Sequence, residues 1–222
     1  MADANSILAS LALAEVGEEP LTSLLDAGKA AQVVNLVLPQ ARGEIFDLPV
    51  SWKFATSRVQ LDQLSTAPDF GYLYQYKLPP HCRRIIATVD ENGDEIQYKY
   101  RREVYISGPN YTPVLLCNQE ECRILFIANI VNPGLWPAWF SKLVVLNMAI
   151  MIAKPLTREV RMKLNLLYAW KDAYNLAKAV NDMEDIDVSD KNRNLDLGNN
   201  DVLEAASSID PNRVNELLYP GW

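Results

Sequence analysis

The strongest constraint on this fold is the stretch of residues 139–153, WFSKLVVLNMAIMIA, which is apolar on almost every side of a helix. A helix of this kind must be surrounded by other protein. Lys154 and Pro155 then predict a corner, because a residue that precedes proline is pushed out of the helical region. A second helix is predicted over residues 157–183, with a length of about 40 Å. We expect this helix pair to form the centre of the fold.

The second helix has an amphipathic pattern. Its predicted core face repeats at steps of three and four residues, the period of one helix face: Val160, Leu164, Leu167, Trp170, Tyr174, Ala177 and Val180. Basic residues occupy other positions: Arg158, Arg161, Lys163, Lys171 and Lys178. They indicate either a solvated face, or a basic lining that passes along phosphate without binding it tightly.

A membrane span is weighed against a buried helix for residues 139–153. Spanning roughly 30 Å of hydrocarbon takes about 20 apolar residues, which is more than this stretch offers. The N-terminus begins Met1-Ala2-Asp3 and lacks the basic flank of a signal peptide. The sequence therefore favours a buried core or subunit-interface helix and no membrane partner.

Cysteine content and charge limit the function. The three cysteines, Cys82, Cys117 and Cys122, are few and odd in number, which favours a reducing compartment over a disulfide framework. The formal net charge is −7, of which residues 184–222 carry −6 and the rest of the chain −1. Proteins that grip nucleic acid normally carry a basic surplus, so tight DNA binding is not expected.

The rest of the chain predicts helices at the N-terminus and strands in the middle. Residues 5–15 and 26–47 have helical patterns, and Pro39 is expected to kink the second. Asp90 to Asp94 contains Asn-Gly and predicts a hairpin turn. Strands are predicted over residues 72–78, 84–89, 96–101, 102–107, 114–117 and 122–130, the last two forming a hairpin.

These elements predict an α+β fold. Its layout is a helical bundle of two N-terminal and two long C-terminal helices, with one inserted antiparallel β-sheet and an extended C-terminal arm. Residues 1–51 and 131–184 would form one helical domain. Residues 52–130 would form an antiparallel β domain, and residues 185–222 an acidic arm.

The predicted arm changes composition along its length. Asp, Asn and Ser dominate as far as Asp210, with single apolar residues too far apart to form a core. The end of the sequence then gathers apolar residues, Leu217, Leu218, Tyr219 and Trp222 among them. We interpret this as a tether whose apolar end binds a neighbouring chain or another protein; the alternative is a frayed terminus.

Few residues offer catalytic or metal chemistry. His81 and Cys82 are adjacent, but neighbours in a strand point to opposite faces, which does not suit a catalytic pair. A zinc set of His81, Cys82, Cys117 and Cys122 would have gaps of zero and four residues, a poor fit to the spacing of zinc sites. We find no phosphate-binding glycine loop and no nucleophile elbow. The sequence predicts neither an enzyme nor a cofactor or metal.

A set of short motifs resembles the head–tail adaptor of short-tailed phages, also called tail tubular protein A or the gatekeeper ring protein. The N-terminal helix ends in Val16-Gly17-Glu18-Glu19-Pro20, followed by Ser23-Leu24. A Trp-x-Phe-Ala motif follows at Trp52, Phe54 and Ala55, and a Tyr-x-Tyr-x-Leu-Pro motif at Tyr74, Tyr76, Leu78 and Pro79. His81 stands where the family often has an acid. The resemblance covers roughly residues 5–185.

The resemblance implies a structural virion protein, not an enzyme. It implies a homo-oligomeric ring of about twelve copies at the head–tail junction, assembled in the host cytoplasm. The partners would be the portal protein, the tail nozzle protein and, further out, tail fibres. Double-stranded DNA would pass through the ring during retention and ejection of the genome, without reading of its sequence. The arm residues Leu217, Leu218, Tyr219 and Trp222 would bind a partner, and Arg158, Arg161, Lys163 and Lys171 would face the portal or a neighbour.

Two other functions stay open at this level. A monomeric accessory module would bind a peptide on the aromatic strand face of residues 72–76. A hydrolase or metal protein would use His81 and Cys82.

Overall fold

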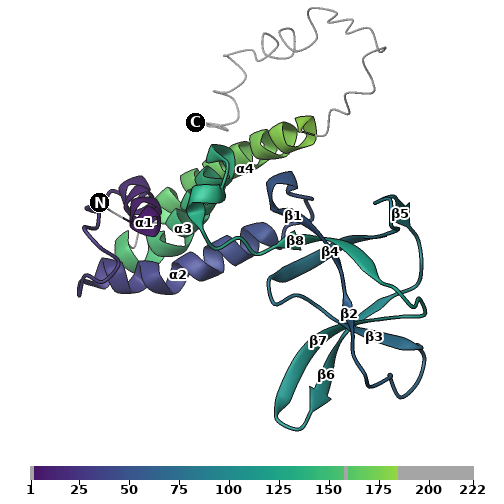
Figure 1. Ribbon diagram of the computed structural model, residues 1–222. Coiled ribbons are helices and arrows are strands. Elements are labelled where there is room, and N and C mark those ends of the chain that lie inside the picture. Colours follow the sequence, from purple (N-terminus) through teal and green to yellow (C-terminus); the bar gives the residue numbers. More distant parts are fainter. Residues whose placement is uncertain (1–2, 158–159, 185–222) are drawn as a thin grey trace, which may run out of the picture. The chain divides into compact units, whose positions relative to one another are not determined.

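The computed structural model of the chain describes residues 3–157 and 160–184 (Figure 1). The chain divides into two units, Met1–Glu184 and Asp185–Trp222, and all described residues belong to the first. This unit contains four α-helices and two antiparallel sheets of four strands each. The predicted arm, residues 185–222, lies outside the described residues.

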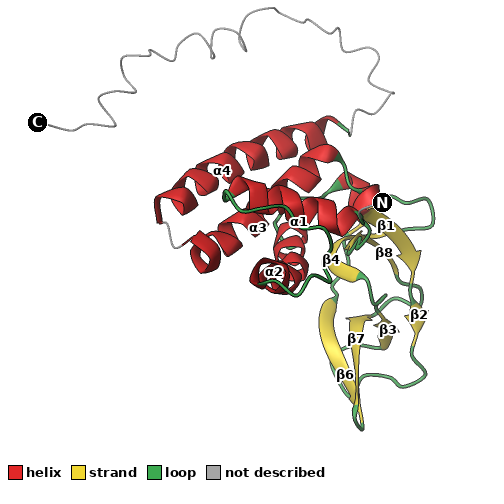
Figure 2. Ribbon diagram, turned by 90° about the vertical axis from the view of Figure 1, so that its left-hand side faces the viewer, coloured by secondary structure: helices red, strands yellow, loops and turns green. Residues whose placement is uncertain are grey.

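One apolar helix organises the helical region. The four helices are α1 (Ala4–Glu15), α2 (Lys29–Phe46), α3 (Ala138–Thr157) and α4 (Val160–Met183). Helix α3 contacts each of the other three, whereas α1 and α2 touch each other only slightly. Its side chains Phe140, Leu143 and Ala153 are fully buried, as predicted for a helix that is apolar on every side. The remaining helices thus cover α3 (Figure 2).

The length of α3 corrects the predicted corner. The helix continues through Pro155 to Thr157 and does not end at Ala153. Pro155 lacks the N–H that would donate to the Met151 carbonyl, but only Leu156 and Thr157 follow it in the helix, so the loss is confined to the helix end. Residues Ala138–Leu156 are therefore long and apolar enough to cross a membrane by length and composition, contrary to the sequence estimate, although half of this window is buried within the protein. The packing of α3 identifies it as a core helix.

The strands form two sheets, not one. The first has the order β1-β8-β4-β5 and the second β2-β3-β7-β6. The strands are β1 (Thr56–Gln60), β2 (Asp62–Gln63), β3 (Tyr74–Lys77), β4 (Cys82–Val89), β5 (Glu95–Ile96), β6 (Arg101–Ser107), β7 (Asn110–Cys117) and β8 (Arg123–Ala128). Short 3₁₀ helices at Lys53–Ala55 and Pro133–Leu135 connect the sheets to the helices.

The predicted fold class is therefore wrong in its layout. A bundle of two helix pairs with one inserted sheet does not match helices gathered around α3 beside two sheets. The cause lies in pairing between distant strands. Strand β8 does not fold back on β7 as predicted but pairs with β1 and β4, so the chain passes from one sheet to the other between Cys117 and Arg123.

The predicted hairpin at Asp90–Asp94 forms, and a second hairpin joins β6 to β7. The turn from Asp90 to Asp94 joins β4 to β5, with the Asp90 amide donating to the Asp94 carbonyl over 2.9 Å. Gly93 has a φ of +90°, a conformation that glycine adopts readily. Only Glu95 and Ile96 pair back, so the strand predicted over residues 96–101 is shorter than expected. The second hairpin, β6–β7, is in register from Arg101 opposite Leu116 to Ser107 opposite Asn110.

An aromatic cluster joins the helices to the first sheet. The Phe140 ring of α3 lies 4.8 Å from Phe46, 4.7 Å from Phe54 and 5.7 Å from Trp52, between ring centroids. Trp136 and Trp139 complete the cluster around it. The Trp52 indole is fully buried and donates to the Ile45 carbonyl over 2.9 Å. Because Trp52 and Phe54 directly precede β1, this cluster fixes where the first sheet begins.

We expect Phe140→Ala to lower the free energy of unfolding by about 3–5 kcal/mol, because it leaves a cavity among five other aromatic rings. Urea unfolding followed by tryptophan fluorescence measures the change. Phe70→Ala is the matched control: the Phe70 side chain is 87% exposed and should change stability by no more than about 0.5 kcal/mol. Equal effects of the two substitutions would contradict a core role for Phe140.

Candidate interaction surfaces

The described residues hold no group of three or more His, Cys, Asp or Glu side chains arranged to bind a metal ion. His81 is exposed, with its ring 5.5 Å from that of Phe126, whereas Cys82 is buried at the next position. The two side chains thus have opposite surroundings, as the strand geometry predicts. Burial raises the pKa of the Cys82 thiol, partly offset by Arg102, and this keeps the thiol protonated.

Cys117 and Cys122 form a buried pair at the crossing between the sheets. Both are free thiols, and a hydrogen bond between them lowers the pKa of Cys117 and raises that of Cys122. The Tyr98 hydroxyl lies 3.4 Å from Cys122 Sγ, and burial raises the pKa of Tyr98. The sequence predicts the two cysteines as ordinary apolar positions across a hairpin, and it does not indicate their contact with Tyr98.

A first apolar surface lies on the β6–β7 hairpin. Val104, Ile106 and Tyr111 are 56%, 62% and 71% exposed. Ile106 lies opposite Tyr111 in the register, and Val104 is two residues away on the same strand, so the three share one face of the hairpin. We call these residues the hairpin stripe. Strand β6 is also the last strand of its sheet, which leaves its outer edge without a neighbouring strand among the described residues.

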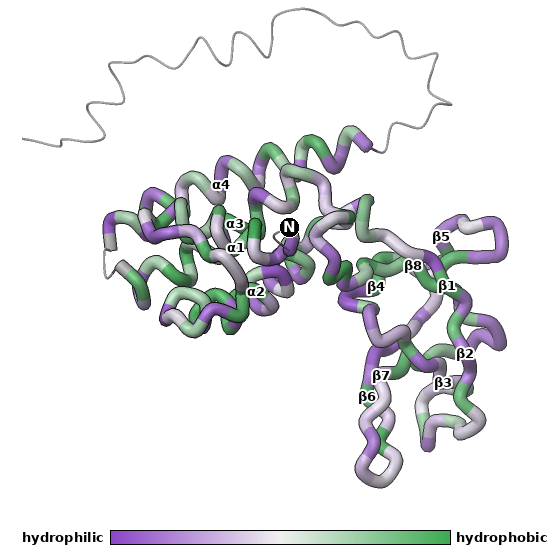
Figure 3. The backbone as a smooth tube through the Cα atoms, turned by 60° about the vertical axis from the view of Figure 1, so that its left-hand side comes forward, coloured by the Kyte–Doolittle hydropathy of each residue, from purple (hydrophilic) through white to green (hydrophobic). Residues whose placement is uncertain are grey.

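A second apolar surface lies on α4. This helix buries Leu166, Ala177 and Asn181, which lie on the side that packs against α3. Leu164 and Leu167, predicted to face the core, are instead 51% and 42% exposed. The helical period assigned these two residues to the wrong side because α4 has two apolar sides. Hydrophobic and hydrophilic positions alternate along its length (Figure 3).

The exposed side of α4 combines apolar and basic residues. Tyr168 is 70% exposed and lies four residues after Leu164, one helical turn further on. Exposed basic residues flank Leu164 and Tyr168 at helical spacing. We call the set the α4 outer stripe: Arg161, Leu164, Leu167, Tyr168, Lys171 and Lys178. Such a face is unusual for a solvated helix, which is expected to be polar on the side opposite the core.

A third surface is an acidic hollow at the end of the β region. It has a volume of about 720 Å³ and lies between the β4–β5 turn and the connection from β7 to β8. Its described lining includes four carboxylates, Asp90, Glu91, Glu120 and Glu121. Arg123 also lines it and is ion-paired with Glu121.

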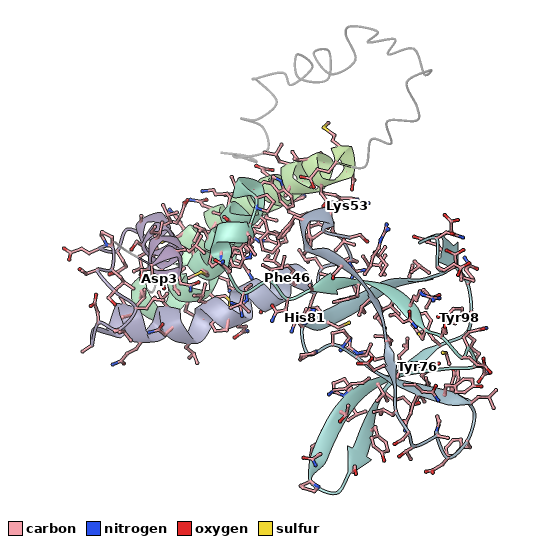
Figure 4. The ribbon with its side chains drawn as sticks, viewed as in Figure 1. Asp3, Phe46, Lys53, Tyr76, His81 and Tyr98 are labelled. Carbon is pink, nitrogen blue, oxygen red and sulfur yellow. The ribbon has the colours of Figure 1, made fainter. Side chains whose placement is uncertain are left out.

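Aromatic rings form the apolar part of the acidic hollow. Tyr74 and Tyr98 line it, together with Ile96. Tyr98 lies in the β region with Tyr76 (Figure 4). Backbone hydrogen bonds from Asp94 and then Asn92 hold the pKa of Asp90 below its ordinary value, so Asp90 stays charged. Carboxylates beside aromatic rings favour a cationic side chain as a partner.

Asn181 fixes the end of α4. Its side chain is 1% exposed; Oδ1 accepts a hydrogen bond from the Lys53 amide over 2.8 Å, and Nδ2 donates to the Ser51 carbonyl over 3.1 Å. Lys53 lies beside the C-terminal end of α4 (Figure 4). These two bonds join α4 to the segment that leads into β1, so they determine which side of α4 faces outward.

The residues predicted from the sequence fall into three groups. Trp52, Tyr76 and Leu78 are buried, and Tyr74, Phe54 and Pro79 are half-buried. The Tyr76 hydroxyl donates to the Gln119 carbonyl over 2.6 Å, and burial raises the pKa of Tyr76 to about 12. Arg161, Lys163 and Lys171 are exposed on α4, with Lys163 on its flank. Arg158 and the arm residues Leu217, Leu218, Tyr219 and Trp222 lie outside the described residues.

No protein-family model matches the chain, and no curated protein sequence matches it.

We expect Asn181→Ala to lower the free energy of unfolding by about 1–3 kcal/mol, because it removes two hydrogen bonds from a buried site. The Lys53 amide should also exchange its hydrogen faster, which hydrogen-exchange mass spectrometry measures. Asn175→Ala, on an exposed part of the same helix, is the control and should leave both quantities nearly unchanged. Unaltered exchange at Lys53 in Asn181→Ala would show that the side chain does not hold this junction.

Proposed function

We propose that this chain is a structural subunit of a homo-oligomeric ring, the head–tail adaptor of a short-tailed phage, placed between the portal and the tail nozzle. The observation that carries the proposal is the presence of two exposed apolar surfaces, the hairpin stripe and the α4 outer stripe, on different elements. The order of the Val-Gly-Glu, Trp-x-Phe-Ala and Tyr-x-Tyr-x-Leu-Pro motifs supports the same conclusion.

Exposed large apolar side chains gathered on one face favour contact with another protein. A symmetric dimer needs only one such surface, because the same patch meets itself. Two different surfaces favour an assembly in which one of them, the hairpin stripe, is left for the portal or the nozzle, while the copies meet one another head-to-tail through different faces. Contacts of this kind close into a ring when the rotation per subunit is a fraction of a full turn.

The charge of the chain suits a ring around DNA. Residues 1–183 carry a formal charge of −1 and residues 184–222 carry −6. A near-neutral body would let double-stranded DNA pass without strong retention, since phosphate binding depends on a surplus of Lys and Arg. We propose no enzymatic activity and no cofactor. The subunits would assemble in the host cytoplasm and stay in the virion.

The alternative function, a monomeric module that binds a peptide on the aromatic strand face, is less well supported. Tyr76, at the end of that face, is 1% exposed and packs in the core of the β region, and Tyr72 and Tyr74 are half-buried. A buried side chain does not offer a peptide-binding surface. The hairpin stripe remains open to a protein other than a second copy, and within the adaptor proposal this protein is the portal or the nozzle.

Native mass measured for the purified chain, alone and mixed with the portal ring of the same phage, tests the proposal. We expect an assembly of about twelve copies in at least one of the two samples. A chain that stays monomeric in both, at concentrations far above those of the portal ring, would contradict the adaptor function.

A further inference from the structure

We infer that the α4 outer stripe of one copy docks into the acidic hollow of the next copy, and that this contact is the repeated interface of the ring. The inference depends on the proposed ring and specifies which surfaces build it. The outer stripe consists of Arg161, Leu164, Leu167, Tyr168, Lys171 and Lys178. The described lining of the acidic hollow includes Tyr74, Asp90, Glu91, Ile96, Tyr98, Glu120 and Glu121.

The two surfaces are complementary in charge. The outer side of α4 presents three exposed bases, Arg161, Lys171 and Lys178, together with two exposed acids, Asp172 and Asp182, so its surplus is one positive charge. The described residues that line the hollow include four carboxylates and one base, Arg123, and the ion pair of Arg123 with Glu121 leaves the other three carboxylates in surplus. Opposite potentials of this kind orient two proteins during encounter and disfavour the wrong pairing.

The apolar parts also match. Leu164 and Tyr168 lie between the bases of the outer stripe, and burial of these exposed side chains by another protein would be favourable. Ile96 is 40% exposed and lies with Tyr74 and Tyr98 in the hollow, where the aromatic rings accept both an aliphatic side chain and a lysine ammonium group.

The contact has to be between copies. Helix α4 packs on α3 through Leu166 and Ala177, and Asn181 fastens its end to residues 51–53. Arg161, Leu164, Tyr168 and Lys171 lie on the side of the helix opposite these contacts, and Leu167 and Lys178 lie on its flank, so the outer stripe faces away from the other described residues. Each copy would therefore contact one neighbour through its outer stripe and the other neighbour through its acidic hollow. This is the head-to-tail arrangement that a ring requires.

Duplex DNA is the other ligand that fits a basic helix face. The observations favour a second copy, because apolar Leu164, Leu167 and Tyr168 separate the bases of the outer stripe. A phosphate-binding face would instead offer bases and polar groups in an unbroken row. A duplex contact is nevertheless an outcome that the following experiment detects.

Two charge-reversed full-length variants test the interface. Lys171→Glu with Lys178→Glu makes the outer stripe acidic, and Glu91→Lys with Glu120→Lys makes the hollow basic. Each variant alone then juxtaposes like charges and should raise the dissociation constant of assembly at least about tenfold in analytical ultracentrifugation. An equimolar mixture should recover assembly, with the two variants alternating, because each of its interfaces pairs opposite charges. The four positions are exposed, so both variants should fold.

Lys77→Glu with Lys99→Glu is the matched control, because it makes the same change of charge at exposed positions outside both surfaces. This variant should assemble like the wild type. Carbodiimide cross-linking of mixed nitrogen-14 and nitrogen-15 wild-type chains gives a second readout. It should join Lys171 or Lys178 of one copy to Glu91, Glu120 or Glu121 of another.

Rings that persist in both reversed variants, or a mixture that fails to recover, would overturn this interface and leave the adaptor function standing. Loss of duplex DNA binding with unchanged assembly in Lys171→Glu with Lys178→Glu would overturn it in favour of a DNA contact. Wild-type chain that neither assembles nor cross-links between copies, with or without the portal, would overturn both proposals.

Discussion

The packing of Phe140 is the interaction on which the rest of the structure depends. Its ring contacts aromatic side chains from α2, from the segment before β1, and from the approach to α3. Aromatic pairs at these centroid distances add stabilisation beyond the burial of their surface. Because the cluster includes Trp52 and Phe54, the same contacts that close the helical core also position the first sheet. The helical and β regions therefore share one core at this junction.

Local sequence patterns predicted the positions of helices and turns better than they predicted which strands pair with each other. The all-round apolar pattern of α3 identified a buried helix, and Asn92-Gly93 identified the β4–β5 turn. Sheet topology could not be read in the same way, because β8 pairs with β1, which is about sixty residues earlier in the chain. Nothing near Cys117 or Cys122 in the sequence marks the crossing between sheets, and this is why one sheet was predicted where two exist.

The surfaces were harder to predict than the core. Of the residues predicted to face the core, Ala177 is buried and Trp170 and Tyr174 pack against the core, whereas Leu164 and Leu167 are exposed and Leu166 is buried instead. A helix with two apolar sides gives the same periodic signal whichever side is buried. The sequence alone therefore does not distinguish the side that packs within the chain from the side that is open to another protein. The acidic hollow likewise forms from the β4–β5 turn and the β7–β8 connection, which are distant in sequence. Each of them alone has the composition of a solvated loop.

Asn181 has a mechanical consequence. Its amide group ties the end of α4 to both sides of Trp52, through the Ser51 carbonyl and the Lys53 amide. A force on α4 along its axis is therefore transmitted to the strand that starts at Thr56, and both hydrogen bonds bear the load together. If a ring subunit is pulled at this helix during DNA passage, the first sheet moves with it. The buried amide of Asn181 therefore provides a direct mechanical connection between α4 and the segment that begins the first sheet.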